Sequence, residues 1–209
     1  IEEWNGSLLA VGQFDRFNGV QLPGIVRLSA DGVLDHSFLA GLPSISGQLS
    51  SVTLQDDGRI LLAGDFHASS VEGDYSLNYT NIARLNRDGG LDSSFQPITA
   101  KADPVTHLDG PVHTVAIQSD GRIILGGGFD SFGGLERPGI VRIDYNGELD
   151  HSINFGSGAN DDVFAVVVQD DSRIMLGGNF SKFDGREAPH LARVYGGLDY
   201  SPGRVRVEK

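Results

Sequence analysis

The sequence predicts an all-β protein made of four tandem copies of one structural unit. A first block of apolar residues ends in phenylalanine four times, at Phe14, Phe66, Phe129 and Phe180. A second block follows each one and carries a shared arginine, at Arg27, Arg84, Arg142 and Arg193. The 29 glycines are spread along the chain, which is typical of many tight turns. Because no segment sustains a 3.6-residue apolar period, we expect few helices.

The strands of one unit can be read in order along the chain. Residues 115–118 and 123–126 are short apolar runs separated by a Ser-Asp-Gly turn, which predicts a β-hairpin. A third strand is expected at a position such as 82–86, and a short fourth strand around 91–95. Four strands in a repeat of about 50 residues is the spacing of propeller blades.

The predicted fold is therefore a single β-propeller domain over residues 1–209, with four blade-like repeats of four short antiparallel strands. Their approximate boundaries are 1–48, 49–110, 111–160 and 161–209. The tail at 204–209 alternates with period two after a Pro-Gly turn. Either this tail closes a four-bladed ring by adding a strand beside the first blade, or the chain is part of a larger propeller. Ring closure removes exposed sheet edges.

Composition excludes several classes of function. The formal net charge is −12, and no sizeable basic stripe is present, so we expect no nucleic-acid partner. There are no cysteines, which excludes disulfides, thiolate metal sites and cysteine nucleophiles. No apolar run approaches the ~18 residues of a membrane span. We therefore expect no membrane-spanning segment.

The repeated residues resemble a known repeat family. The run Gln-x-Asp-Gly-Arg-Ile-x-Leu-x-Gly-x-Phe, followed by Ile-Ala-Arg-Leu-x-x-Asp-Gly-x-Leu-Asp-x-Ser-Phe, is similar to the delta-60 repeat of bacterial β-propeller proteins. The resemblance covers nearly the whole chain and is loosest in the fourth repeat, where Ser172 replaces the turn glycine. The paired glycines after the second strand also resemble kelch blades. The resemblance implies a location outside the cell or at its surface, the periplasm being the alternative, and it implies no shared catalytic residues.

A recurrent arginine and aspartate lie eight residues apart across a turn in three repeats. In an antiparallel hairpin this spacing brings the two side chains together, and we interpret the pair as a structural link rather than a ligand site. The pairs are Arg27 with Asp35, Arg84 with Asp92, and Arg142 with Asp150; the fourth copy, Arg193 with Asp199, is two residues shorter. The four phenylalanines are expected to pack between blades.

The Asp-Gly turns also have the oxygen-rich composition of calcium loops. The segment 86–92 (Asn-Arg-Asp-Gly-Gly-Leu-Asp) resembles a truncated loop, but it lacks the terminal bidentate glutamate of an EF-hand. Tight hairpin turns require the same residues. We therefore expect no cofactor and no metal site, with weak surface calcium binding left open.

The residues that the repeats do not share are the candidates for function. The second repeat carries the largest deviation, residues 67–80, which we expect to form a long loop between its second and third strands. Loops on a rigid scaffold are where binding residues concentrate. The candidate binding residues in this loop are His67, Asp74, Tyr75, Asn78 and Tyr79.

Two functions from different classes remain. The first is a non-catalytic extracellular interaction or scaffold module within a larger secreted or surface protein or assembly, binding a protein or glycan or associating with itself. The second is a glycan-active hydrolase or lyase that uses paired carboxylates at the propeller axis. No nucleophile motif such as Gly-x-Ser-x-Gly is present, which favours the first.

Overall fold

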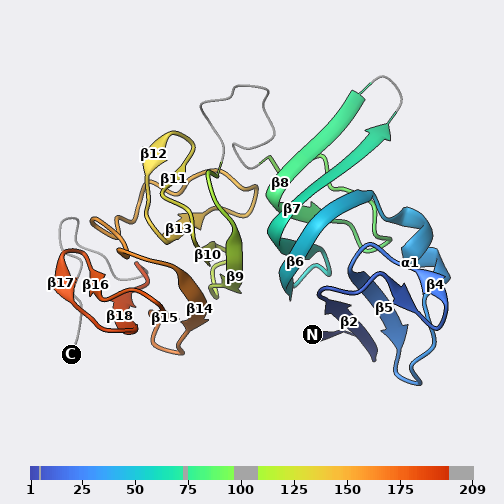
Figure 1. Cartoon of the computed structure of the whole chain (residues 1–209), viewed down its shortest axis with the longest axis horizontal. Coiled ribbons are helices and arrows are strands. Elements are labelled where there is room, and N and C mark those ends of the chain that lie inside the picture. The colour runs from blue at the N-terminus through green and yellow to red at the C-terminus, as the bar shows by residue number, and fades with distance from the viewer. Residues whose placement is uncertain (5, 73–74, 97–107, 198–209) are drawn as a thin grey trace. The chain divides into compact units, whose positions relative to one another are not determined.

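The computed structural model describes residues 1–4, 6–72, 75–96 and 108–197, and these are mostly β-strands and turns. The chain divides into two compact units, Ile1–Phe95 and Gln96–Lys209 (Figure 1). The first unit contains the strands of the first two repeats, and the second unit contains those of the last two. The tail at 204–209, which closes the ring in one of the two alternatives above, lies outside the described residues.

The first unit contains two three-stranded antiparallel sheets, one in each repeat. The first sheet has the order β1-β2-β5, and the second has the order β6-β7-β8. The elements of this unit, in chain order, are β1 (Glu2–Trp4), β2 (Ser7–Val11), β3 (Arg16–Phe17), β4 (Val20–Gln21), β5 (Ile25–Ser29), α1 (His36–Gly41), β6 (Ser44–Leu54), β7 (Ile60–Glu72) and β8 (Tyr75–Leu85).

The second unit repeats this plan with sheets β9-β10-β13 and β14-β15-β18. Its elements are β9 (Val112–Ile117), β10 (Ile123–Gly127), β11 (Ser131–Phe132), β12 (Leu135–Glu136), β13 (Ile140–Ile143), β14 (Val163–Val168), β15 (Arg173–Gly178), β16 (Lys182–Phe183), β17 (Arg186–Glu187) and β18 (Leu191–Tyr195). The all-β prediction and its several small antiparallel sheets are thus confirmed.

In the first three repeats the main sheet has three strands rather than the four that the sequence predicts, and the end of the fourth repeat lies outside the described residues. The segment expected as the fourth strand meets the third strand at an isolated bridge, Leu28 with Leu34, Leu85 with Leu91 and Ile143 with Leu149. An aspartate follows each bridge, and its carboxylate accepts the backbone N–H two residues ahead, as Asp92 Oδ1 does from Ser94 N at 2.9 Å. This local bond competes with the ladder and turns the chain away from the sheet.

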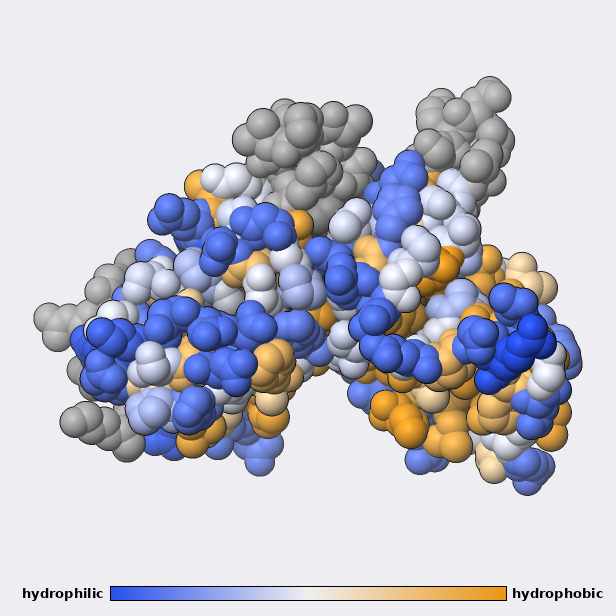
Figure 2. Space-filling model, viewed as in Figure 1, coloured by the Kyte–Doolittle hydropathy of each residue, from blue (hydrophilic) through white to orange (hydrophobic). Residues whose placement is uncertain are grey.

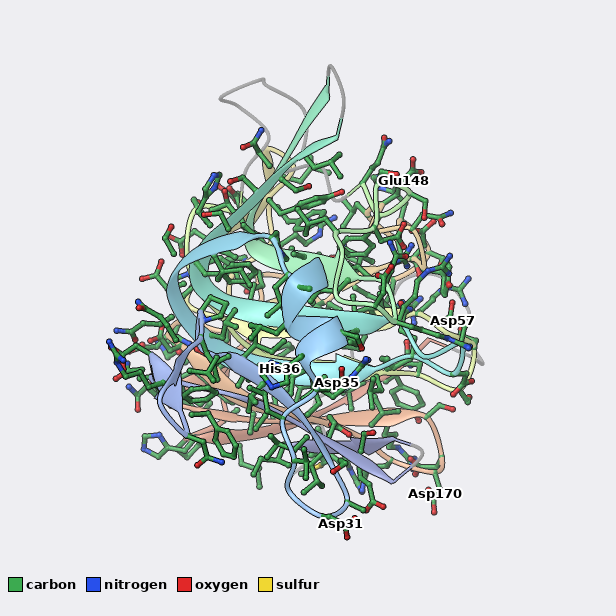
Figure 3. All side chains as sticks on the ribbon, turned by 90° about the vertical axis from the view of Figure 1, so that its right-hand side faces the viewer. Asp31, Asp35, His36, Asp57, Glu148 and Asp170 are labelled. Atoms are coloured by element: carbon green, nitrogen blue, oxygen red, sulfur yellow. The ribbon has the colours of Figure 1, made fainter. Side chains whose placement is uncertain are left out.

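In the first repeat the same aspartate begins a short helix. The Asp35 side chain accepts the backbone N–H groups of Ser37 and Phe38 and caps α1, the one helix among the described residues (Figure 3). A carboxylate is a favoured cap because it satisfies N–H groups that have no partner within the helix. The expectation of few helices is therefore confirmed for this part of the chain.

The predicted hairpins between the first and second strands are present, and they share one turn geometry. Gly58 N donates to Gln55 O, Gly121 N to Gln118 O, and Ser172 N to Gln169 O, at 2.7 to 2.9 Å. The donor residue has positive φ in each turn, 79° at Gly58, 82° at Gly121 and 64° at Ser172. Glycine adopts this conformation without steric penalty, whereas serine does not.

Replacing Ser172 by glycine should therefore raise the free energy of unfolding by about 0.5 to 1 kcal/mol, because the left-handed conformation no longer strains a side chain. Urea unfolding at neutral pH measures the change. Ser44→Gly is the matched control. Ser44 is an exposed strand residue whose φ is not positive, so the change to glycine should lower stability instead. A loss of stability in Ser172→Gly would contradict the account of the turn.

The core of the second unit joins its two sheets. Ile124 and Ile140 of the β9-β10-β13 sheet belong to one buried cluster with Val163, Ile174 and Leu176 of the β14-β15-β18 sheet. Side chains of one sheet therefore pack directly on the facing side of the next. This is the packing expected of consecutive propeller blades.

Three of the recurrent phenylalanines, Phe14, Phe129 and Phe180, lie just after the end of the second strand, whereas Phe66 lies within β7. Phe66, Phe129 and Phe180 are buried, and Phe14 is half-buried. In the first, third and fourth repeats the chain then forms a hairpin with strands of two residues, β3-β4, β11-β12 and β16-β17. These hairpins were not predicted, although Asn18-Gly19, Gly133-Gly134 and Asp184-Gly185 are strong two-residue turn signals.

Candidate functional site: the arginine clasp and the polar face of the second repeat

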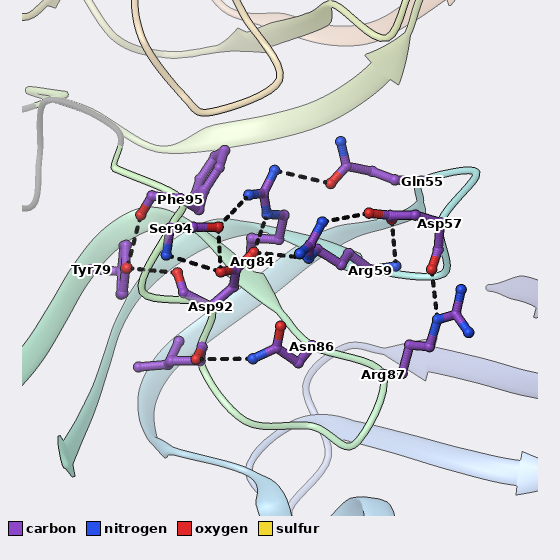
Figure 4. A network of polar contacts seen from close by, with 11 residues as sticks. Gln55, Asp57, Arg59, Tyr79, Arg84, Asn86, Arg87, Asp92, Ser94 and Phe95 are labelled. Atoms are coloured by element: carbon purple, nitrogen blue, oxygen red, sulfur yellow. Dashed lines mark hydrogen bonds and ion pairs between the residues drawn. The ribbon is translucent and has the colours of Figure 1, made fainter.

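Arg84 is the centre of a buried polar network in the second repeat (Figure 4). Its Nε donates to Asp92 Oδ2 at 2.7 Å, and its two terminal nitrogens donate to Gln55 Oε1 at 3.3 Å and Ser94 Oγ at 3.2 Å. Arg59 Nε lies 3.1 Å from the same carboxylate oxygen. The Arg84 guanidinium also lies over the Phe95 ring, 4.7 Å from its centroid. We call this arrangement the arginine clasp.

The third repeat builds the same clasp from equivalent residues. Arg142 Nε donates to Asp150 Oδ2 at 2.8 Å, and its terminal nitrogens donate to Gln118 Oε1 and Ser152 Oγ, each at 3.0 Å. Arg122 Nε completes it at 2.8 Å from Asp150 Oδ2. Two repeats therefore place the same five side chains, which are two arginines, an aspartate, a glutamine and a serine, at matching distances.

The first repeat contains a reduced version of the clasp. Arg27 Nε donates to Asp35 Oδ2 at 2.9 Å, and its guanidinium lies 4.4 Å from the centroid of the Phe38 ring. Ser7 stands where the other repeats have a turn arginine. The pairing of Arg193 with Asp199 lies outside the described residues, because Asp199 is not among them.

The clasp holds its carboxylates ionised. Hydrogen bonds from Ser37, and then from Phe38 and Arg27, overcome the effect of burial and lower the pKa of Asp35 to about 2. Burial alone would raise the pKa of Asp92, but Ser94 and Arg84 outweigh it and the pKa lies below its usual value. Burial is likewise outweighed at Asp150, whose pKa is lowered by Ser152, Arg142 and Arg122. A buried ion pair of this kind fixes the chain after the third strand.

The second repeat differs from the others in its sheet rather than in a loop. Residues 67–80, predicted as a long loop, are mostly the outer parts of β7 and β8, which pair as far as Glu72 with Tyr75. Strand β6 runs beside β7 as far as Ser44 with Ser69. The long β7-β8 hairpin is visible in Figure 1. The alternation of Ser76, Leu77, Asn78, Tyr79 and Thr80 already indicated a strand.

One side of this extended sheet is polar and exposed or half-exposed. Directly paired residues share a face, so the register places Ser46, His67 and Thr80 in one row and Ser44, Ser69 and Asn78 in the next. The polar face consists of Ser44, Ser46, Gln48, Asp65, His67, Ser69, Asn78 and Thr80. It is nearly uncharged, in contrast to the chain as a whole.

The five candidate binding residues do not act as one group. His67 and Asn78 lie on the polar face and are exposed. Tyr79 lies on the opposite face and is buried, and its hydroxyl donates to Asp92 O at 3.0 Å and to Phe95 O at 2.8 Å. It is therefore part of the core and cannot make the surface contact expected of it. Asp74 lies outside the described residues, and Tyr75 is described only as the first residue of β8.

A depression adjoins the polar face within the first unit. Its volume is about 430 Å³, and its walls include Phe14, Asp15 and Pro23 from the first repeat and Ser46 and Gln48 from the polar face. A smaller depression of about 280 Å³ occupies the equivalent place in the second unit, between Phe129, Pro138 and Asp162. The depression is therefore a feature of the repeat joint. Among the described residues, only the depression of the first unit is continued by the polar face.

The segment resembling a calcium loop uses its oxygens within the turn. Asp88 Oδ1 accepts the Gly90 N–H at 3.1 Å, Asn86 Nδ2 donates to Leu91 O at 3.3 Å, and Asp92 belongs to the clasp. Across the described part of the chain, no three histidine, aspartate or glutamate side chains gather as metal ligands would. Nor does this part contain a helix with the length and apolar character needed to cross a bilayer.

Sequence reasoning missed most partners of the clasp. Gln55 and Gln118, which accept from the arginines, and Ser94 and Ser152, which also contact the aspartates, were overlooked. Their signal was available, because Gln lies three residues before the turn glycine in the second and third repeats and Ser follows each clasp aspartate by two residues. The strand carrying Ser44, Ser46 and Gln48 was likewise missed as part of the candidate site.

The repeats match the model of a protein family. The family described as "Domain of unknown function (DUF5122) beta-propeller" matches residues 5–38, 55–95 and 118–152, which together span more than half of the chain. These ranges fall in the first three repeats. Neither the curated proteins nor the solved structures give a significant match. The chain therefore belongs to the DUF5122 β-propeller family.

Proposed function

We propose that this chain is a non-catalytic interaction module in which the four repeats are successive delta-60-type blades of one β-propeller. The module belongs to a larger secreted or surface protein of bacteria, and its partner is a protein or a glycan. The observation that carries the proposal is the polar face of the second repeat. It is built on the same scaffold as the other repeats, yet it adds an exposed surface that the scaffold itself does not need.

The chemistry of the polar face supports a partner rich in hydrogen-bonding groups. Hydroxyl and amide side chains dominate it, and Asp65 and His67 are its only ionisable groups. Such a surface attracts neither strongly charged ligands nor apolar ones. Three paired strands hold the side chains in fixed positions, which lowers the entropy lost on binding. The adjoining depression of about 430 Å³ has the size of a small-ligand site.

The ionisation of the carboxylates supports a non-catalytic role. A glycoside hydrolase needs one carboxylic acid whose pKa is raised so that it can donate a proton near neutral pH. Five carboxylates among the described residues have a pKa below its usual value: Asp35, Asp92, Asp109, Asp150 and Asp171. These groups are acceptors in turns and ion pairs. They are suited to holding the fold and not to general-acid catalysis.

A binding assay with charge-introducing variants tests the proposal. The wild type is applied to a glycan array and to a panel of purified extracellular proteins, and each binder is then tested with His67→Glu and Ser46→Glu. Both residues are exposed on the polar face, so we expect binding to weaken at least about tenfold, with a small change in stability.

Gln21→Glu is the matched control, because Gln21 is an exposed strand residue of the first repeat outside the polar face. It should leave binding unchanged. Equal binding by all variants would contradict the assignment of the polar face. No binding by the wild type on either panel, or release of cleaved glycans, would contradict the proposed function itself.

A further inference from the structure

The depression between the first two repeats has walls from three short segments of the first unit. These are residues 12–15, which follow β2, residues 22–24, which precede β5, and residues 45–48 of β6. The depression therefore lies at the strand ends of the first sheet rather than on the face of a sheet. Its volume of about 430 Å³ falls within the range of roughly 300 to 1,000 Å³ that is usual for small-ligand pockets.

Backbone hydrogen bonds hold the walls from the first repeat in place. Gly12 N donates to Gly24 O at 3.0 Å, and Leu22 N donates to Asp15 O at 2.8 Å. The second bond closes the base of the β3-β4 hairpin, which carries hydrophilic residues at the surface in Figure 2. Fixed positions of this kind reduce the entropy that is lost when a ligand binds.

Four polar residues in these walls are exposed, and no described residue forms a hydrogen bond or an ion pair with their side chains. Gln13 and Asp15 come from the first repeat, and Ser46 and Gln48 come from the polar face of the second. Together they supply two amides, one carboxylate and one hydroxyl, so they can both donate and accept hydrogen bonds. This hydrogen-bonding capacity is available to a ligand.

The equivalent depression of the second unit does not offer the same groups. A glycine stands in place of Gln13, and Asn160 stands in place of Ser46, two residues before the carbonyl that lies against the glycine of the paired strand. The Asn160 side chain is engaged within the fold. Its Oδ1 accepts the backbone N–H groups of Ser181 and Lys182 at 2.9 and 2.7 Å, and its Nδ2 donates to Ser181 Oγ at 3.1 Å. Among the described residues, the set of four available side chains is therefore particular to the first unit.

Phe14 adds an apolar surface to these polar groups. It is half-buried, whereas its equivalents Phe66, Phe129 and Phe180 are at most 3 % exposed. Pro23 is a further apolar residue of the lining, and no lysine, arginine or histidine of the described chain lines the depression. Recognition of phosphates and carboxylates relies on such cations. The lining therefore suits a ligand with several hydroxyl groups, an apolar patch and no negative charge.

We infer that this depression binds one neutral pyranose ring of a glycan. The inference rests on the proposed function, because it selects the glycan from the two classes of partner. The Asp15 carboxylate accepts hydrogen bonds from neighbouring sugar hydroxyls, and Ser46 and Gln48 bind further hydroxyls. The C–H groups of the sugar ring lie against Phe14, because the face of an aromatic ring carries partial negative charge. A single small ring makes few contacts, so its dissociation constant should be about 1 mM.

Titration of the full chain, followed by nuclear magnetic resonance, tests this inference. The probes are the methyl glycosides of glucose, galactose, mannose and N-acetylglucosamine. At least one of them should cause saturable shifts of the backbone amides at residues 12–15 and 45–48, with a dissociation constant of about 1 mM. Asp15→Asn and Gln48→Ala should each weaken that binding at least about fivefold, because each removes a hydrogen-bonding group. Asp130→Asn is the matched control: Asp130 is exposed at the equivalent position of the second unit, so binding should be unchanged.

Two charged probes separate a sugar site from a site for other ligands. The methyl glycoside of glucuronic acid should bind at least about threefold more weakly than the best neutral glycoside, because Asp15 repels its carboxylate and no cation of the lining offsets this. Nα-acetyl-lysine amide, the probe for a cation site, should bind more weakly than that glycoside as well.

Three results would overturn the inference. They are the absence of saturable shifts with all four neutral glycosides, wild-type affinity in both depression variants, and tighter binding of either charged probe than of every neutral glycoside. If one of them is found while an extracellular protein binds the wild type but not His67→Glu, the sugar assignment fails and the proposed function stands. The two proposals are therefore tested separately.

Discussion

Replacing Arg84 by methionine should lower the free energy of unfolding by about 3 to 5 kcal/mol. The Arg84 side chain is fully buried and connects Asp92, Gln55 and Ser94. Methionine fills similar space, so the main effect is to leave these polar groups in a low-dielectric site with fewer partners. Urea unfolding followed by circular dichroism measures the loss.

Three further variants locate the origin of this effect. Arg16→Met removes an arginine that is exposed in β3, and we expect a change within about 0.5 kcal/mol. Arg84→Lys keeps the charge but cannot make the same three contacts, so it should remain clearly destabilised. The double variant Arg84→Met/Asp92→Asn should be less destabilised than the sum of its single changes, because it removes the carboxylate that the first change leaves unpaired. A loss below about 1 kcal/mol in Arg84→Met would contradict the structural role of the clasp.

Replacing Gly178 by alanine should lower the free energy of unfolding by about 2 to 3 kcal/mol. An added Cβ would lie 2.0 Å from Asp162 O and 2.9 Å from Val163 Cα, so the backbone of β14 or β15 must move. The equivalent glycines of the second and third repeats, Gly64 and Gly127, meet the carbonyls of Gln48 and Pro111 at 2.0 and 2.1 Å. The close approach of neighbouring strands is thus a property of the repeat.

The adjacent glycine is the control for this prediction. A Cβ at Gly177 has Ala165 Cβ at 3.8 Å and His190 O at 3.9 Å, which are ordinary contact distances. Gly177→Ala should therefore leave stability unchanged or raise it slightly, because alanine restricts the unfolded chain. Differential scanning calorimetry of the two single variants makes the comparison. Equal melting temperatures would show that the strand spacing is not limited by Gly178.

The repeat scaffold was predictable because the residues that form its strands, turns and ion pairs recur from one repeat to the next. The eight-residue spacing of Arg84 and Asp92 predicted an ion pair, and the structure brings these side chains to 2.7 Å. The prediction of a fourth strand was wrong. The β-propensity of these residues favours another strand in the sheet, whereas the Asp92 side chain accepts a backbone N–H locally and turns the chain away. In a single repeat the sequence Asp-x-Ser only weakly predicts a local hydrogen bond of this kind. The prediction becomes possible when Asp-x-Ser recurs at the same place in several repeats.

The candidate site was less predictable because its segment occurs once. Residues 67–80 were compared with shorter connections and interpreted as an inserted loop, although their alternation fits paired strands. Tyr79 was chosen because tyrosine serves well at interfaces, but the same amphipathic character lets it fill the core while its hydroxyl reaches two carbonyls. Which face of a strand is buried depends on the neighbouring sheet. That information is absent from the segment itself.

Amide hydrogen exchange across the whole chain tests most directly whether four equivalent sheets make up this protein. The middle strand of each sheet is hydrogen-bonded on both sides, so four maxima of protection are expected, in β2, the 60–63 part of β7, β10 and β15. The intervening Asp-Gly turns should exchange rapidly. Protection confined to one or two of these strands, with the others exchanging at the rates of an unfolded chain, would contradict the fourfold architecture.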